Sequence, residues 1–449
     1  MHKEVLPMAI DPKYFIHEDD KAALDALKAI PGFTAFIKAF MKVWNENQFR
    51  ILNMSSRIRI DENQLPKYYR MLEPICGKLG IEVPELYLEL NVNPNAYTYG
   101  DTKPFIVMTS GLIDTVPEEL IPTVLAHECG HIACHHTLYR TMGQMILSGT
   151  MGIPGIGALI SLPLQIAFAY WMRCSEFSAD RAAILVDGDA ENIIDLCMRL
   201  SGYTKNVGDE AHKAEFLKQA EEYKALIKDD VLNQTMEFMI LAGQSHPLTA
   251  VRAYEANAWA SSDNVTKLLS YYGEVSRSMP HTEVPIGEAA ALMKGRNAEA
   301  LAAELKDAGF TDVTCVRETT ADLFTAEGSV TGITINGASD FNAESWFPSD
   351  AKVEISYYAP LTPEEEAAAH PGEIRMPMSS LSCYGRDYVS LCQELVNAGF
   401  KNIFTVQDPG IRPLFLKDGG VTKVTLGDVS DFEKGDWFPA DVKIRVMHF

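Results

Sequence analysis

The chain has 449 residues, 47% of them hydrophobic and 22% charged, and its formal net charge is −22. This composition is ordinary for a soluble globular protein, and the length suggests two to four domains. The chain is acidic and has no cluster of basic residues that could bind a phosphate backbone. We therefore expect no nucleic-acid partner.

The start of the chain and its cysteines indicate a reducing compartment. The first residues, Met-His-Lys-Glu-Val-Leu-Pro, lack the apolar segment of a signal peptide. The eight cysteines are scattered, and no two of them form a Cys-x-x-Cys pair. We therefore expect a cytoplasmic protein.

The first hundred or so residues predict helices followed by strands. Apolar residues recur at helical spacing over residues 18–48, and a further helix is expected from Asp61 towards Gly80. Residues 85–90 and 105–109 are apolar runs with the character of strands. We expect two antiparallel strands here, beside the next helix, where they could hold a substrate.

The motif His-Glu-x-x-His, formed by His127, Glu128 and His131, lies in the helical segment 121–136. The two histidines stand at i and i+4 on one face of a helix, so both can bind a single Zn²⁺. Glu128 can then take a proton from the zinc-bound water. The alternative is a chance occurrence, because so short a motif also arises in unrelated chains.

A catalytic zinc needs a third protein ligand and an open fourth position. Glu176 and Asp180 stand at i and i+4 of a later helical segment. Glu176 can complete the site, and Asp180 can fix the tautomer of a zinc-bound imidazole. The alternative for Glu176 is an exposed carboxylate paired with Arg173 or Arg181.

Two further histidines, His135 and His136, follow the motif. His135 lies at i+4 from His131, but an ion shared by these two would leave Glu128 without a role. We therefore expect His135 and His136 to be exposed to solvent or to contact a metal-binding residue without binding the metal themselves.

The helical pattern continues past His131 through Leu138 and Met142, and residues 145–172 are then apolar. Because His131 and Glu176 must meet at one ion, this segment has to return to the side it left, and it is too short for two membrane spans. Its glycines and prolines also interrupt it. We expect a short helical hairpin that is buried, or that contacts a membrane or a hydrophobic partner peripherally without spanning the membrane.

Residues 186–243 are expected to form further helices with a solvated face. His246 and Pro247 then open a helix over residues 248–260, from which Arg252 can point back to the metal. The alternative for His246 is a capping or surface histidine.

The chain resembles a family of zinc metallopeptidases over about residues 65–255. Four motifs occur in the order found in the HtpX-like enzymes, which are gluzincins and relatives of the CAAX prenyl endopeptidases: Asn95-Ala96-Tyr97 before a strand, His127-Glu128-Cys129-Gly130-His131, Arg173-x-x-Glu176-x-x-x-Asp180 and His246-Pro247-x-x-x-x-Arg252.

The resemblance implies a zinc centre and a general base. His127, His131 and Glu176 would bind one Zn²⁺ per chain, and Glu128 would be the base.

The resemblance also implies a way of holding a protein or peptide substrate. Asn95, Ala96 and Tyr97 would form an edge strand along the substrate backbone, and His246 would stabilise the oxyanion. The members best known for these motifs are integral membrane proteins, and this chain departs from them in that respect.

The C-terminal part of the chain repeats internally. Gly295-Arg296, Glu304-Leu305, Ala308-Gly309-Phe310, Val330-Thr331 and Trp346-Phe347-Pro348 recur as Gly385-Arg386, Glu394-Leu395, Ala398-Gly399-Phe400, Val421-Thr422 and Trp437-Phe438-Pro439. Each copy predicts one helix followed by about three strands, and the copies resemble PASTA-like modules. Neither has a cluster of histidines, cysteines or carboxylates, so we interpret both as binding or spacer modules whose Trp-Phe-Pro residues serve packing.

The sequence thus predicts a mostly α-helical, zincin-type α+β peptidase domain over residues 1–278, followed by two small α+β modules. The modules would span residues 282–358 and 373–449, with a linker over 359–372. The predicted function is zinc-dependent hydrolysis of peptide bonds. The competing hypothesis is a non-enzymatic adaptor, in which zinc is structural or absent and the repeats bind partners.

Overall fold

The computed structural model describes residues 9–43, 46–147, 162–204, 206–208, 210–227, 248–272, 282–322, 324–411 and 414–449. The chain divides into two compact units. The first comprises Met1–Met293, Leu301–Thr314 and Ile333–Glu354, and the second Lys294–Ala300, Cys315–Gly332 and Ile355–Phe449. Within the described ranges, no helix combines the length and apolar character needed to cross a membrane.

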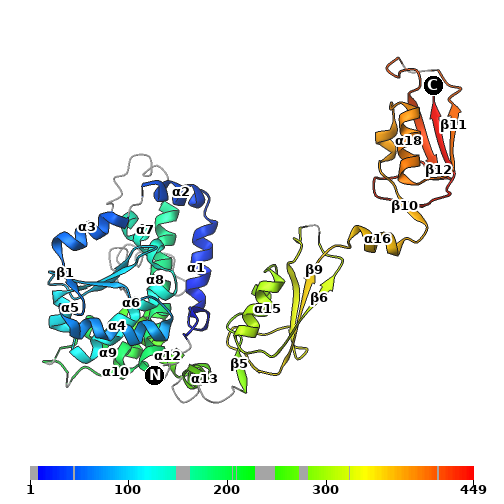
Figure 1. The fold of residues 1–449 in the computed structure, drawn as a ribbon. Coiled ribbons are helices and arrows are strands. Elements are labelled where there is room, and N and C mark those ends of the chain that lie inside the picture. Colours follow the sequence, from blue (N-terminus) through cyan, green and yellow to red (C-terminus); the bar gives the residue numbers. More distant parts are fainter. Residues whose placement is uncertain are drawn as a thin grey trace. The chain divides into compact units, whose positions relative to one another are not determined.

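Up to residue 272, the described part of the first unit consists mainly of helices that pack around one small sheet (Figure 1). Helices form over most of the predicted range 18–48. The helix predicted from Asp61 begins only at Pro66, and Gly80 ends it with a left-handed φ of 68°. The helices of this part are α1 (Glu18–Ala29), α2 (Phe33–Val43), α3 (Glu46–Ser56), α4 (Pro66–Leu79), α5 (Ser110–Thr115), α6 (Ile121–Ala133), α7 (Thr137–Leu147), α8 (Leu162–Asp187), α9 (Glu191–Leu200), α10 (Lys213–Ile227), α12 (Thr249–Ala260) and α13 (Asp263–Tyr272), with short 3₁₀ turns at Pro12–Tyr14 and Glu118–Leu120.

The sheet has four strands in the order β1-β2-β4-β3, namely β1 (Ile58–Ile60), β2 (Glu85–Glu89), β4 (Phe105–Thr109) and β3 (Ala96–Tyr99). The prediction that residues 85–90 and 105–109 are antiparallel is wrong, because β2 and β4 pair in parallel. The chain passes from β2 to the edge of the sheet, forms β3, and returns as β4 between them. This crossover places β3 at the edge, next to α6 and α7.

Helix α6 ends earlier than its apolar pattern predicts. The expected continuation through Leu138 is interrupted at His135, which adopts a left-handed φ of 56° and is exposed. α7 then begins at Thr137. The reversal brings the backbone N–H of His136 to the carbonyl oxygen of His131 at 2.9 Å, so His136 folds back towards the motif.

The predicted apolar hairpin over residues 145–172 lies partly outside the described residues, which stop at Leu147 and resume at Leu162. The apolar stripes of α1 and α2 pack on the described part of α8. Phe36 and Phe40 join Phe168 and Trp171 in one buried cluster. These stripes therefore serve core packing, as their spacing predicts.

α6 and α8 pack against each other at unusually close range. A side-chain carbon on Gly130 would stand 2.7 Å from Cβ of Ala182 and 3.1 Å from Cα of Ala179. Only glycine fits at this crossing, and the facing residues of α8 are alanines, whose small side chains allow the close approach.

The C-terminal residues form the same succession of elements twice. The first set is β5 (Glu283–Pro285), α14 (Ala290–Met293), α15 (Ala298–Asp307), β6 (Asp312–Glu318), β7 (Val330–Ile335), β8 (Trp346–Pro348) and β9 (Lys352–Tyr358). The second set is β10 (Glu373–Arg375), α17 (Ser380–Cys383), α18 (Tyr388–Ala398), β11 (Ile403–Gln407), β12 (Val421–Leu426), β13 (Trp437–Pro439) and β14 (Ile444–His448). The three-stranded sheets have the orders β6-β9-β7 and β11-β14-β12.

The predicted linker over residues 359–372 contains a helix, α16 (Pro363–Ala369). Thr362 caps it by accepting from the backbone N–H of Glu365, whose side chain in turn accepts from the backbone of Thr362. This reciprocal capping, followed by three alanines, explains why the segment is helical.

The repeated tryptophans both make packing contacts. Trp346 Nε1 donates to Asn264 Oδ1 at 2.8 Å, and its ring meets Tyr271 edge-on. Trp437 stacks on His370 with ring centroids 4.5 Å apart.

Gly130→Ala tests the close approach of α6 and α8. We expect it to lower the free energy of unfolding by about 1–3 kcal/mol, because the added methyl group forces the helices apart. The control is Gly77→Ala in α4, where nothing lies within 4 Å of the added carbon. That change should raise stability by about 0.5–1 kcal/mol, since alanine favours a helix. Urea unfolding measures both, and equal effects would contradict the packing argument.

Candidate metal centre

Helix α6 presents His127 and His131 on one face, and α8 presents Glu176 opposite them. All three side chains are buried, and each offers one atom within 4.8 Å of those of the other two. Nε2 of His127 is 3.5 Å from Glu176 Oε2, and Nε2 of His131 is 3.4 Å from Glu176 Oε1. Glu176 is therefore not the exposed carboxylate of the alternative hypothesis.

These three residues suit a zinc ion by the chemistry of their donor atoms. Two imidazole nitrogens and one carboxylate form a common set of protein ligands for a catalytic zinc. Nε2 of His131 is buried and has no hydrogen-bond partner among the described residues. Burial and the nearby Arg140 guanidinium hold the pKa of His131 well below its usual value, so the ring is neutral and its nitrogen can bind a metal.

The orientation of His127 is fixed by Asp180, one turn beyond Glu176 on α8. Nδ1 of His127 donates to Asp180 Oδ1 at 2.9 Å, which leaves Nε2 directed at Glu176. Burial alone would lower the pKa of His127, but the hydrogen bonds to Asp180 and Glu176 outweigh it and raise the pKa to about 9. The surroundings thus favour positive charge at this position.

Asp180 is in turn held by Arg252 of α12. Nε of Arg252 donates to Asp180 Oδ2 at 2.8 Å and Nη2 to Oδ1 at 2.6 Å. This bidentate pair offsets the burial of the carboxyl and keeps the pKa of Asp180 below its usual value.

A second chain of contacts starts at His131. Its Nδ1 lies 3.0 Å from Nδ1 of His136, whose Nε2 lies 2.9 Å from Asp20 Oδ2 on α1. Asp20 also accepts from Trp171 Nε1 at 2.8 Å and from Ser178 Oγ. With Asp20 ionised, each ring donates towards it, so Nε2 of His131 keeps its lone pair for an ion.

Asp20 and Arg140 also belong to this cluster, although neither is predicted from the sequence. Nη1 of Arg140, on α7, forms an ion pair with Glu176 Oε1 at 2.7 Å, while Nη1 of Arg252 lies 3.2 Å from Oε2. Asp20 is one of three consecutive acidic residues in the first turn of α1, and nothing in that pattern marks it out.

The charges of this buried cluster do not balance without a cation. The cluster contains four buried carboxylates, those of Asp20, Glu128, Glu176 and Asp180, and two guanidinium groups, those of Arg140 and Arg252, which contact Glu176 and Asp180. With His131 neutral and His127 protonated, as its raised pKa favours, one negative charge remains among these side chains, and with both imidazoles neutral two remain. A divalent cation between His127, His131 and Glu176 would compensate them.

Glu128 is connected to the edge strand of the sheet. Thr98 Oγ1 donates to Glu128 Oε2 at 2.6 Å, and both side chains are buried. The strand that borders the site therefore also positions the carboxylate adjacent to the two histidines in sequence.

The three residues predicted to hold substrate lie at or next to β3. Ala96 and Tyr97 belong to the strand, whereas Asn95 precedes it and its carbonyl oxygen accepts from the N–H of Thr109. The Tyr97 hydroxyl donates to Glu89 Oε2 at 2.7 Å. His246 lies outside the described residues.

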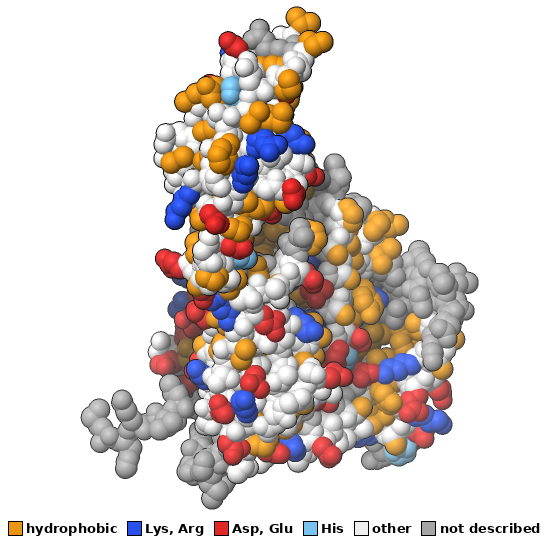
Figure 2. All heavy atoms as spheres, turned by 90° about the vertical axis from the view of Figure 1, so that its right-hand side faces the viewer, with side chains coloured by type: hydrophobic (Ala, Val, Ile, Leu, Met, Phe, Trp, Pro, Cys, Tyr) orange, Lys and Arg blue, Asp and Glu red, His pale blue; other side chains and the backbone are white. Residues whose placement is uncertain are grey.

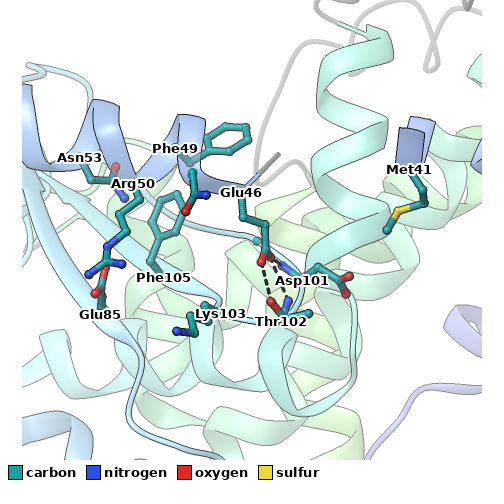
Figure 3. A pocket seen from close by; sticks show the side chains of 12 residues that line it. Met41, Glu46, Phe49, Arg50, Asn53, Glu85, Asp101, Thr102, Lys103 and Phe105 are labelled. Atoms are coloured by element: carbon teal, nitrogen blue, oxygen red, sulfur yellow. Dashed lines mark hydrogen bonds between the residues drawn. The ribbon is translucent and has the colours of Figure 1, made fainter. Parts of the chain in front are cut away.

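A surface pocket of about 480 Å³ opens beyond the end of β3 (Figure 3). α3 and the turn between β3 and β4 form its walls. Glu46 accepts from Thr102 N at 2.9 Å and from Thr102 Oγ1 at 2.6 Å, which joins the two walls. No metal-cluster carboxylate or histidine lines the pocket, so it is separate from the candidate metal centre.

Comparison with known proteins adds family evidence to this geometry. A family model described as peptidase family M48 matches residues 70–260. The plastoglobule-localized metallopeptidase 48 of Arabidopsis thaliana is 32% identical over 266 residues, which are 58% of this chain and 76% of that protein. A protease HtpX homolog of Ralstonia pickettii is 24% identical over 202 residues, or 39% of this chain and 70% of that protein.

A comparison of folds finds the crystal structure of Ste24p from S. mikatae. The match has 16% sequence identity and a TM-score of 0.27. It covers 53% of this chain and 61% of that one, which is less than two thirds of the solved chain.

Asp20→Asn tests the contact chain from α1 to His131. We expect zinc affinity to fall about ten-fold, because outer hydrogen bonds orient metal-binding imidazoles. The free energy of unfolding should fall by about 2–4 kcal/mol, since buried donors lose a charged acceptor. Competition with a chromophoric chelator and urea unfolding measure the two effects.

The matched control is Asp19→Asn in the same helical turn. The Asp19 side chain is 61% exposed, so both quantities should change by less than about 0.5 kcal/mol. If the two substitutions act alike, the effect comes from the charge of the helix end and not from the contact with His136.

Proposed function

The chain belongs to peptidase family M48 and is a metalloprotease, and we propose that it is an endopeptidase in which His127, His131 and Glu176 hold one Zn²⁺ and Glu128 activates the attacking water. The observation that carries this proposal is the buried set of two imidazoles and one carboxylate inside a cluster with excess negative charge. Substrates would be proteins or peptides.

The proposed mechanism divides the work between the metal and the chain. When bound, zinc would polarise the scissile carbonyl and lower the pKa of a water molecule towards 7. Glu128 would accept a proton from that water and deliver it to the leaving amine. Thr98 supports this role, because its hydroxyl donates to one oxygen of Glu128 and so positions the carboxylate.

Outer residues would keep the two imidazoles in the form that binds metal. Asp180 accepts the Nδ1 proton of His127, and His136 accepts that of His131. Arg252 would hold Asp180 in place. Each ring would then direct Nε2 at the ion.

Substrate would lie along β3. We propose that Asn95, Ala96 and Tyr97 align its backbone and that His246 donates to the developing oxyanion. The edge position of β3 and its link to Glu128 through Thr98 support this arrangement. Strand addition at a sheet edge is a common way to hold an extended peptide.

The alternative is an adaptor whose zinc is structural. A structural zinc has four protein ligands. The described residues supply three, and Glu128 is tied to Thr98 instead of completing the set. This arrangement favours the catalytic assignment.

We propose that residues 282–358 and 373–449 are tandem modules that select partners and do not take part in the chemistry. Their recurring residues and the matching sheet orders β6-β9-β7 and β11-β14-β12 support this proposal. A cytoplasmic location, with or without peripheral membrane contact, stays a prediction.

Glu128→Gln separates the base from the ligands. We expect this variant to retain zinc and to lose about 10²–10⁴-fold in kcat on a fluorogenic peptide, the usual contribution of a general base. His131→Ala and Glu176→Ala should lose zinc as well as activity. Equal zinc loss in all three variants would overturn the division of roles.

His246→Ala tests the proposed oxyanion donor. Removal of one such donor costs about 10²–10³-fold in kcat, so this variant should lose turnover while its KM and zinc content stay near those of the wild type. Wild-type turnover would return His246 to the capping or surface histidine of the alternative hypothesis.

A further inference from the structure

The second C-terminal module has a sheet face that no described element covers. One face of β11-β14-β12 packs on α18 through a core that includes Val424, Ile444 and Val446. The other face, which we call the open face, carries the alternate residues of each strand.

The strand register places six residues side by side on the open face. Phe404 pairs with Arg445, which pairs with Thr425, and Val406 pairs with Met447, which pairs with Lys423. Phe404 is 45% exposed and Val406 40%, although both are large and apolar.

Basic groups surround these apolar side chains. Lys423 and Arg445 are exposed on the open face itself, and Nζ of Lys443 lies 5.2 Å from the centroid of the Phe404 ring. Within the described part of the chain, none of these three cations has an ion-pair partner. Figure 1 shows α18 on one side of the strands, and Figure 2, which views them from the other side, shows hydrophobic and basic side chains next to one another at its top.

The first module provides an internal comparison, because it repeats the same pattern without this surface. The positions of Phe404, Lys423, Arg445 and Met447 correspond in the first copy to Thr314, Gly332, Glu354 and Ser356. Val406 and Lys443 recur as Val316 and Lys352. Packing alone therefore does not require the other four residues, Phe404, Lys423, Arg445 and Met447.

The first module is also much more acidic than the second. Residues 282–358 contain five basic and 13 acidic residues, whereas residues 373–449 contain nine basic and ten acidic. The basic residues on the open face thus stand out in a strongly acidic chain.

We propose that the open face binds an acidic segment with large apolar side chains in protein substrates and so brings them to the peptidase. Carboxylates of the segment would pair with Lys423, Arg445 and Lys443, and its apolar side chains would cover Phe404, Val406 and Met447. This inference rests on the proposed peptidase function only for its second part, the delivery of substrate.

Binding is tested on the full-length protein in the presence of a zinc chelator, which stops hydrolysis. The probe is a fluorescein-labelled ten-residue peptide that alternates glutamate and phenylalanine, read by anisotropy. We expect Lys423→Glu combined with Arg445→Glu, and separately Phe404→Ser, to weaken binding at least about ten-fold, because each removes charge or apolar contact from the surface. Lys434→Glu, an exposed charge reversal in the turn before β13, should leave binding unchanged.

Two comparisons make this test decisive. A lysine-phenylalanine peptide should bind much more weakly, and equal binding of the glutamate peptide to all variants would overturn the proposal. Vesicles containing phosphatidylserine test a lipid surface. Loss of vesicle binding in the open-face variants, with peptide binding unchanged, would also overturn it.

Substrate delivery is measured separately with zinc present. A fluorogenic peptide extended by the glutamate-phenylalanine segment should have a lower KM than the unextended peptide. This difference should vanish in the Lys423→Glu, Arg445→Glu variant while kcat stays the same. A chain that binds the segment but cuts neither peptide would contradict the peptidase proposal alone, whereas cleavage without a KM difference would contradict delivery by the open face.

Discussion

The metal centre depends on how closely α6 and α8 approach each other. At Gly130 no side chain fits between the helices, and the facing residues of α8, Ala179 and Ala182, have small side chains. Both helices carry their functional residues at i and i+4, so one crossing aligns His127 and His131 with Glu176 and Asp180. A wider crossing would leave the imidazoles and the carboxylate too far apart to share an ion.

Charge organises the surroundings of this crossing. Each imidazole reaches a carboxylate of its own, His127 directly through Asp180 and His131 through His136 and Asp20. Arginines from α7 and α12 pair with Glu176 from two sides. Removal of one member would leave a buried charge without a partner, so each of these contacts matters for stability.

The family model covers the middle of the chain, so the roles of the residues before and after it have to be inferred from the structure. The family model matches residues 70–260, whereas Asp20 lies on α1 before that range and the C-terminal modules lie after it. α1 nevertheless contacts the ligand His131 through His136. The C-terminal residues form the same succession of elements twice, and the two copies differ in the residues of one sheet face.

The sequence by itself determined the residues that can bind zinc, because i and i+4 spacing on a helix places His127 and His131 on one face whatever surrounds them. It also indicated Glu176, Asp180 and Arg252, although the roles of individual residues stay proposals. Only the tertiary structure decided that Asp20 and Arg140 belong to the cluster, since contacts between distant helices leave no local pattern. It likewise decided the parallel pairing of β2 with β4 and the break at His135, because strand order and a single left-handed residue depend on packing that spacing does not encode.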